Sequence, residues 1–231
     1  MILKFWSVKI LRFVVIFFIF SVVVASYFYP GGNILDPSQE GYSIALNFLS
    51  DLGGYKSHSG EVNFISAFFF NMAMFLFLLV GISFIFIPRL FKENSLTHNL
   101  ALIGSAFFFL GTIFFAAIGL TPHDLYRDMH IYFAINAFRL LIPGSIFYVI
   151  VLYRSSVPNK YTYITSFYLL STFFYVFYQI FSGSPLESNQ ALREAALVQK
   201  FIVLISVISI FSLSYAFSSK LKENNILQYN L

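Results

Sequence analysis

The chain contains no cysteine, which excludes disulfide bonds, thiolate catalysis and metal sites with cysteine ligands. This absence does not identify a cellular compartment, because a helical bundle inside a membrane needs no covalent cross-links. Histidine, carboxylate and hydroxyl side chains are therefore the groups from which any catalytic or metal site must be built.

Charged residues are also scarce, since they form 10% of the sequence against 58% for hydrophobic residues. Soluble globular proteins carry roughly 25% charged residues, so a soluble core could not bury this much apolar surface. The net charge of +4 does not indicate nucleic acid as a partner, because the basic residues gather where acidic lipid headgroups would meet them. The 32 phenylalanines are expected to face lipid or to pack between helices.

Six long apolar stretches are each sufficient to cross a hydrocarbon layer of about 30 Å. They cover approximately residues 10–29, 62–87, 99–120, 130–153, 162–182 and 197–219. The first is longer than the apolar region of a cleaved signal peptide, which has about 7–15 residues. We therefore predict an all-α fold, a polytopic integral membrane bundle of six transmembrane helices that forms one domain over residues 1–231.

The charges are sorted by sign between alternate loops, and this sorting predicts the orientation. With Met1 in the cytoplasm, the inner segments hold Lys4, Lys9, Arg12, Arg89, Lys92, Arg154, Lys160, Lys220 and Lys222. All carboxylates except Glu93 and Glu223 fall in the outer segments. Because an excess of Lys and Arg in short loops orients helices during insertion, both termini are expected in the cytoplasm.

Three outer segments share a helix start signal, in which a capping side chain precedes a proline. These pairs are Asp36-Pro37, Thr121-Pro122 and Ser184-Pro185. The first predicts a short amphipathic helix that ends at Gly53-Gly54. The other two predict helices that run directly into the fourth and sixth transmembrane helices. Together they indicate a small helical extracytoplasmic cap.

Most candidate chemistry lies in this polar cap, at Ser50, Asp51, His58, His123, Asp124, Asp128, His130 and Glu194. A metal site, with zinc as the candidate ion, would join His130 to Asp51 and His58. If a helix begins at Thr121, His123 and His130 lie about 10 Å apart along its axis, too far to share one ion unless the first turn unwinds. The alternative is that these histidines are interfacial and form hydrogen bonds with carboxylates.

Asp51 is expected in the last turn of the cap helix, where the helix dipole disfavours an anion by about 0.3–1 kcal/mol. A cation is therefore expected close to Asp51. The adjacent Ser50 is a candidate nucleophile, although a Ser-Asp pair is common. The alternative for both residues is a solvated loop.

Arg139 is the one charge near the middle of an apolar stretch. It lies nine residues after His130, which places it about 13 Å deeper along a helix, at a cost of at least about 2.5–3.5 kcal/mol. A polar clasp that includes Asn71, Gln179 or Tyr175 would offset this cost. The alternative is a bound anion, such as a lipid headgroup or a substrate.

Several motifs resemble a known family. They are Tyr29-Pro30-Gly31-Gly32, Gly41-Tyr42-Ser43, the run from Asn47 to Gly53, Asn71, the run from Gly119 to Asp124, and His130. They are similar to a prokaryotic six-helix membrane family of unknown function whose number is nine-nine-eight. That family is distantly similar to DRAM-like and PGAP-like membrane proteins. The resemblance implies a multi-pass protein of a prokaryotic cytoplasmic membrane with a lipid-linked role, and no defined reaction. The chain departs from the family at His123, where an acid is usual.

Two functions remain open from the sequence. The first is a non-catalytic protein that binds a lipid or isoprenoid headgroup near the outer leaflet through Arg139, Asn71, Asp51, His123 and Asp124. The second is a metal-dependent intramembrane hydrolase that uses Asp51, His130 and His58 around a metal-activated water.

Intramembrane hydrolases of the ceramidase and adiponectin-receptor type also use a serine, an aspartate and three histidines. They have seven helices and a His-x-x-x-His pair, which this chain lacks. A transporter is disfavoured, because only one ionisable group lies deep and no inverted repeat is evident. Membrane lipids are the expected partners, and a homo-oligomer is compatible with the sequence.

Overall fold

The computed structural model describes residues 1–229, and all regular structure in this range is helical. The first helix is continuous from Ile2 and consists of α1 (Ile2–Lys4), the π-helix η1 (Phe5–Ile10) and α2 (Leu11–Phe28). The others are η2 (Leu49–Gly53), α3 (Phe64–Phe86), η3 (Ile87–Leu90), α4 (Ser95–Leu120), α5 (Arg127–Arg154), α6 (Asn159–Phe181) and α7 (Asn189–Tyr229). Six of these helical segments are long and apolar enough to cross a membrane, as the sequence predicted.

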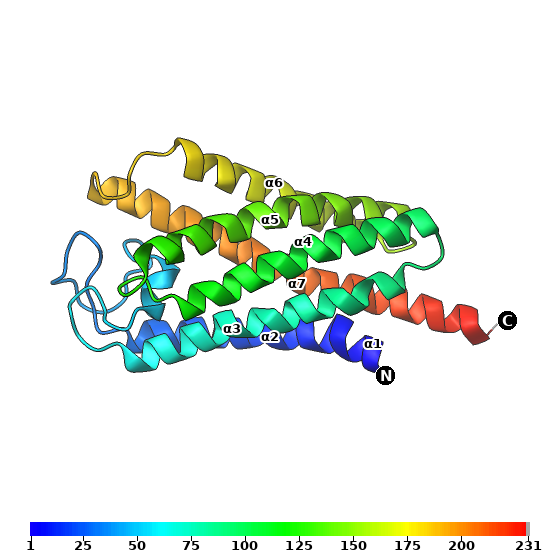
Figure 1. The fold of residues 1–231 in the computed structure, drawn as a ribbon, viewed down its shortest axis with the longest axis horizontal. Helices are drawn as coiled ribbons and strands as arrows, with labels where there is room; N and C mark the ends of the chain where they lie inside the picture. Colours follow the sequence, from blue (N-terminus) through cyan, green and yellow to red (C-terminus); the bar gives the residue numbers. More distant parts are fainter. Residues whose placement is uncertain (230–231) are drawn as a thin grey trace.

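The six long helices pack in a ring that follows the order of the chain. Each helix contacts the next, and α7 closes the ring against α2 and η1. Both termini lie at one end of the bundle with the α3–α4 and α5–α6 connections (Figure 1). We call this the terminal end. The opposite end carries residues 29–63, 121–126 and 182–188, and we call it the loop end.

Close packing between α4 and α5 depends on small residues. A Cβ atom on Gly104 would lie 2.9 Å from side-chain atoms of Phe147 and Tyr148, and one on Gly111 would lie 3.1 Å from Leu141. These glycines therefore let the two backbones approach closely, as small residues do between membrane helices. Ala101 on the same stripe is fully buried.

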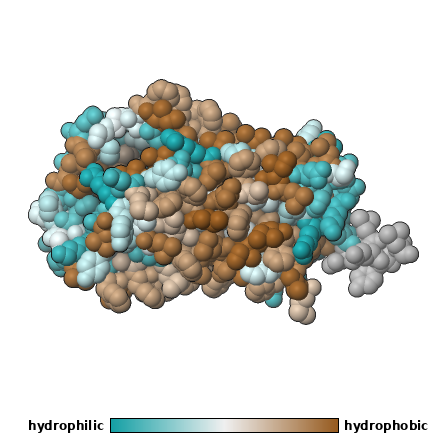
Figure 2. Space-filling model, viewed as in Figure 1, coloured by the Kyte–Doolittle hydropathy of each residue, from teal (hydrophilic) through white to brown (hydrophobic). Residues whose placement is uncertain are grey.

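The outer surface of the bundle is apolar around its middle. In Figure 2, hydrophobic residues form a broad belt, and hydrophilic residues gather toward the two ends. Exposed side chains in this belt include Phe20, Phe75, Leu110, Ile146 and Phe174. Such a continuous apolar belt would be unstable in water and fits a multi-pass integral membrane protein.

The predicted cap helix between residues 36 and 53 is wrong except for its last five residues, which form η2. Upstream, Asn33 Oδ1 accepts hydrogen bonds from the backbone N–H groups of Leu35 and Asp36, and Asp36 accepts one from Ser38. These polar side chains satisfy the backbone locally, so turns replace the helix. Gly32 and Gly41 have positive φ angles of 80° and 59°, which also favour turns.

The two other predicted helix starts are placed too early. The helix α5 begins at Arg127 instead of Thr121, and α7 begins at Asn189 instead of Ser184. After α4 the chain makes a turn in which the N–H group of Tyr126 donates to the carbonyl of Pro122 over 2.8 Å. The first turn of the expected helix is therefore unwound, and His123 lies outside α5.

A buried lysine joins three segments at the terminal end. Lys220 on α7 is 2% exposed, and its Nζ lies 3.0 Å from Glu93 Oε1 and 3.3 Å from Glu223 Oε2. The same atom donates to Ser156 Oγ over 2.8 Å. Lys220 therefore connects α7 to the α3–α4 and α5–α6 loops.

Candidate metal centre

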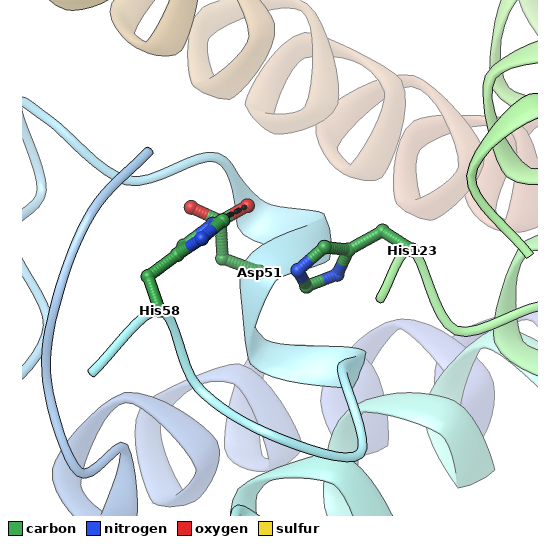
Figure 3. A group of neighbouring side chains, drawn as sticks. All are labelled: Asp51, His58 and His123. Atoms are coloured by element: carbon green, nitrogen blue, oxygen red, sulfur yellow. Dashed lines mark ion pairs between the residues drawn. The ribbon is translucent and has the colours of Figure 1, made fainter. Parts of the chain in front are cut away.

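Asp51, His58 and His123 converge at the loop end. Asp51 lies in η2, His58 in the loop between η2 and α3, and His123 in the turn between α4 and α5. One ligand atom from each residue can be chosen so that all three atoms lie within 4.8 Å of one another. Figure 3 shows the carboxylate and both imidazole rings facing a common space. The predicted ligand group of Asp51, His58 and His130 is therefore wrong in one residue, because His123 is the third member of the observed group.

The carboxylate of Asp51 is buried and oriented by the backbone. Its Oδ2 accepts hydrogen bonds from the Phe48 N–H group over 2.9 Å and from Asn47 Nδ2 over 3.1 Å. Its Oδ1 lies 3.4 Å from His58 Nε2. Asp51 is in the first turn of η2, where unpaired N–H groups stabilise an anion. The expectation that it opposes a helix dipole is therefore wrong.

Side chains from α3 and α7 hold η2 in place. Gln199 on α7 accepts a hydrogen bond from the Leu49 N–H group over 2.8 Å. At the other end of η2, three side chains donate to its last carbonyl groups: Asn63 to Leu52 and Gly54, Ser66 to Leu52, and Asn71 to Gly53. Gln199, Asn63 and Ser66 were missed from the sequence, because polar residues at a helix end have no motif that reveals their partners.

His58 is positioned by Tyr29 and by a glycine. The hydroxyl of Tyr29 accepts a hydrogen bond from the His58 N–H group over 3.2 Å. A Cβ atom on Gly32 would lie 2.5 Å from the His58 carbonyl carbon, so only glycine permits this approach. His58 Nε2 is buried and has no hydrogen-bond partner among the described residues, and it lies 3.4 Å from Asp51 Oδ1. A bound ion would replace this contact with Asp51.

His123 reaches the group because Gly54 has no side chain. A Cβ atom on Gly54 would lie 2.6 Å from His123 Cε1. His123 Nδ1 is buried and unpaired within the described part of the chain. Burial lowers the pKa of His123, and the charge of Asp51 opposes this shift. The ring is therefore neutral near pH 7, which is the form that binds metals.

His130 lies next to the group and is not a member of it. Its ring centroid is 6.1 Å from that of His123, and its Nδ1 is 2.7 Å from the Thr121 carbonyl oxygen. A carbonyl oxygen can only accept, so Nδ1 carries the proton and Nε2 is an acceptor in the neutral ring. Nε2 is buried without a hydrogen-bond partner among residues 1–229. His130 is therefore available to a molecule bound beside His123.

A lysine that the sequence analysis did not select supplies the expected cation. Lys200 Nζ on α7 donates to the carbonyl of Asn47, whose side chain donates to Asp51. Asn47 therefore links the ammonium group of Lys200 to the carboxylate of Asp51. Its position could not be recognised from the sequence, because Asn47 and Lys200 are 153 positions apart.

The remaining candidates have different surroundings. Asp124 accepts hydrogen bonds from the N–H groups of Tyr55 and Lys56 over 2.9 and 2.8 Å, so it ties the two loops together. Arg139 is exposed near the middle of α5 and makes no hydrogen bond or ion pair with a described residue. The predicted clasp with Asn71 is wrong, because the Asn71 amide donates to Gly53. Gln179 and Tyr175 make no hydrogen bond with Arg139 either.

An apolar cavity runs between the helices below the three ligand candidates. The space open to the centre of a water molecule has a volume of about 100 Å³. Ser50, the residue before Asp51, lines its outer end together with Leu49 and Gln199. Ala134, one turn from His130, also lines it. None of the three ligand candidates is among the lining residues, so Ser50 is the residue that connects the group to this apolar space.

Comparison of the chain with protein-family models, curated proteins and solved structures finds no match. The resemblance to the six-helix family therefore stays a prediction. The arrangement of Asp51, His58 and His123 above the cavity carries the functional argument.

Proposed function

We propose that the protein is a metal-dependent hydrolase of the membrane that acts on a lipid-like substrate. One observation carries the proposal: a buried carboxylate and two imidazoles with buried nitrogens converge next to Ser50, which lines an apolar cavity. One carboxylate and two imidazoles form a ligand set found in catalytic zinc sites, in which water occupies the fourth position. Asp51, His58 and His123 are the proposed ligands.

The spacing of the ligand atoms supports this assignment with a small adjustment. Ligands about 2.1 Å from a tetrahedral zinc ion lie about 3.4 Å from one another. The three atoms in this chain lie within 4.8 Å of one another, so the rings would move inward by about 1 Å on binding. His58 and His123 lie in loops, where such a movement is readily accommodated.

The neighbouring residues suit a hydrolytic reaction. A bound zinc ion would lower the pKa of its water to about 7 and polarise a substrate carbonyl. His130 Nε2 would accept a hydrogen bond from that water, because its Nδ1 proton is held by Thr121. Ser50 would contact the part of the substrate where the cavity meets the ligand group.

The charge distribution supports an orientation in which the loop end lies outside the cytoplasm. The terminal end carries most of the Lys and Arg residues, and the loop end carries most of the carboxylates. Under the positive-inside rule the ligand group would lie in or near the outer leaflet, and the membrane we propose is a prokaryotic cytoplasmic membrane. Zinc and substrate would therefore reach the site from outside the cell.

Headgroup binding through Arg139 is the second candidate, and the exposure of this side chain favours it. An exposed guanidinium near the middle of α5 is costly in hydrocarbon unless an anion pairs with it or the side chain extends to the interface. An anionic lipid would supply that anion. Arg139 would then act at the outside of the bundle, separately from the ligand group.

Metal analysis of purified protein tests the hydrolase proposal. Wild type is expected to bind about one zinc ion per chain, and Asp51→Asn, His58→Gln and His123→Gln are expected to lower the affinity at least tenfold. The control is His98→Gln, because His98 lies near the terminal end, where its Nδ1 is 2.9 Å from the Pro88 carbonyl oxygen. Equal zinc affinity in all variants, or no saturable binding in wild type, would contradict the proposal.

A hydrolysis assay provides the second measurement. Ester and amide lipids are supplied to the protein in nanodiscs, before and after treatment with a zinc chelator. Hydrolysis is expected to stop after chelation and to return when zinc is added. Hydrolysis that persists at full rate after the metal is removed would refute the assigned role of the metal.

A further inference from the structure

The cavity is long in the direction of the helix axes. Its lining extends from Phe70 to Phe84 on α3 and from Gln199 to Leu213 on α7. Each pair is 14 residues apart, which corresponds to about 21 Å at a rise of 1.5 Å per residue. The cavity therefore extends from Ser50 at the loop end through about two thirds of a 30 Å hydrocarbon layer.

The cavity is also narrow. Dividing the volume of about 100 Å³ by the length of about 21 Å gives a mean cross-sectional area of about 5 Å² that the centre of a water-sized sphere can occupy. This corresponds to a tube about 2.6 Å in radius once the sphere's own radius of about 1.4 Å is added. Packed aliphatic carbons approach to about 4 Å, so each has a radius of about 2 Å. One file of methylene groups fits this tube, and a branched or double chain does not.

Below its outer end the lining is mainly apolar, although it includes two tyrosines and the buried Ser209 Oγ, which has no hydrogen-bond partner among the described residues. The hydroxyl of Thr112 donates to the Phe109 carbonyl, and that of Ser206 donates to the Ile202 carbonyl, so both are satisfied within their own helices. Seven phenylalanines from α2, α3, α4 and α5 contribute to the remaining wall, together with aliphatic side chains. A ligand that fills the cavity is therefore expected to be apolar along most of its length, with its polar end near Ser50 and Gln199.

We infer that the cavity binds one unbranched alkyl chain of about 16 carbons, with the polar end of the ligand beside Ser50 and Asp51. An extended alkyl chain advances about 1.3 Å per carbon, given C–C bonds of about 1.5 Å, so 16 carbons span about 21 Å. The reaction at the polar end rests on the proposed function, whereas the chain site depends only on the cavity. The substrate class is therefore a lipid with a single long unbranched chain inserted among the helices.

Photo-crosslinking in nanodiscs tests this inference. The probe is hexadecanoic acid with a diazirine at its last carbon, and cross-linked peptides are identified by mass spectrometry. Labelling is expected at Phe84, Phe108 and Leu213, which line the inner end of the cavity. A methyl-branched probe of equal length is expected to label these positions at least tenfold less. Labelling confined to the outer surface, or equal labelling by the branched probe, would overturn the inference.

A blocking substitution provides a matched comparison. Ser209 lines the cavity and is 2% exposed, whereas its neighbour Ile208 is 51% exposed on the outside of α7. Ser209→Phe is expected to reduce inner-end labelling by the 16-carbon probe at least tenfold, while Ile208→Phe has no effect. Ser209 lies ten residues below Gln199, about 15 Å, so a ten-carbon probe should still bind Ser209→Phe. Ser209→Leu is the milder variant if the phenylalanine prevents folding.

Failure of this inference can be distinguished from failure of the proposed hydrolase. Asp51→Asn is expected to lose zinc and to retain labelling by the 16-carbon probe. Labelling at the inner end of wild type without zinc binding would support the chain site and contradict the hydrolase. Zinc binding in wild type without inner-end labelling would contradict the chain site alone.

Discussion

Gly54→Ala tests whether His123 is a metal ligand. Gly54 has φ −64° and ψ 145°, a conformation that alanine adopts without torsional strain. The new Cβ atom would lie 2.6 Å from His123 Cε1 and 2.8 Å from the Lys56 carbonyl oxygen. Ordinary carbon contacts are at least about 3.5 Å, so the ring must retreat by about 1 Å and the Lys56 carbonyl must also shift.

The expected loss of zinc affinity follows from the narrow range of distances that metal ligands tolerate. Metal–ligand distances vary by only about 0.2 Å, so a displacement of about 1 Å removes His123 from the coordination sphere or strains it strongly. We expect zinc affinity to fall about 10–100-fold, which is the range found when residues that orient ligands are changed. This corresponds to about 1.4–2.8 kcal/mol of binding free energy.

Competition with a chelator of known zinc affinity measures the effect. The control is Gly183→Ala in the α6–α7 loop, where the nearest atoms to a new Cβ are the carboxylate oxygens of Glu187 at 3.1 Å. The control should bind zinc as wild type does. Unchanged zinc affinity in Gly54→Ala would show that His123 is not a ligand and would refute the proposed site.

Three further predictions concern orientation, lipid binding and stability. A cysteine introduced at Asn189 should react with an impermeant thiol reagent in intact cells and one at Asn159 only after lysis, and the reverse pattern would place the ligand group in the cytoplasm. Arg139→Leu should reduce co-purifying anionic lipid without changing zinc content, and unchanged lipid would remove the headgroup candidate. Lys220→Met should lower the free energy of unfolding by about 1–2 kcal/mol, because its carboxylate partners are partly exposed, and unaltered stability would show that these ion pairs contribute no net free energy.

The membrane architecture could be predicted because it depends on local composition. Apolar stretches of spanning length predict helices wherever they occur, and all six were found. The helix limits were less accurate, since α7 begins at Asn189 and the first helix at Ile2, both outside the apolar stretches. Helices extend beyond the hydrocarbon layer when their polar ends remain hydrogen-bonded, and hydropathy does not report this.

The candidate site was predictable in its residue types and less so in its geometry. Asp51 and His58 were selected because they are polar residues in one outer loop. The exchange of His130 for His123 followed from one local error, the assignment of a helix start to Thr121. Proline after a capping residue is typical of helix starts, but in this chain Asp124 binds the backbone of a different loop instead. No local pattern shows such a long-range contact.

The hydrogen bond from Leu49 to Gln199 has a consequence for biogenesis. The proposed ligands come from segments before α3 and after α4, but the residue that holds the start of η2 belongs to α7, which leaves the ribosome after both segments. A nascent chain that has not yet inserted α7 therefore contains all three ligands without the side chain that anchors them. Stable metal loading would follow insertion of α7, so bound zinc would mark the chains in which α7 has packed against η2.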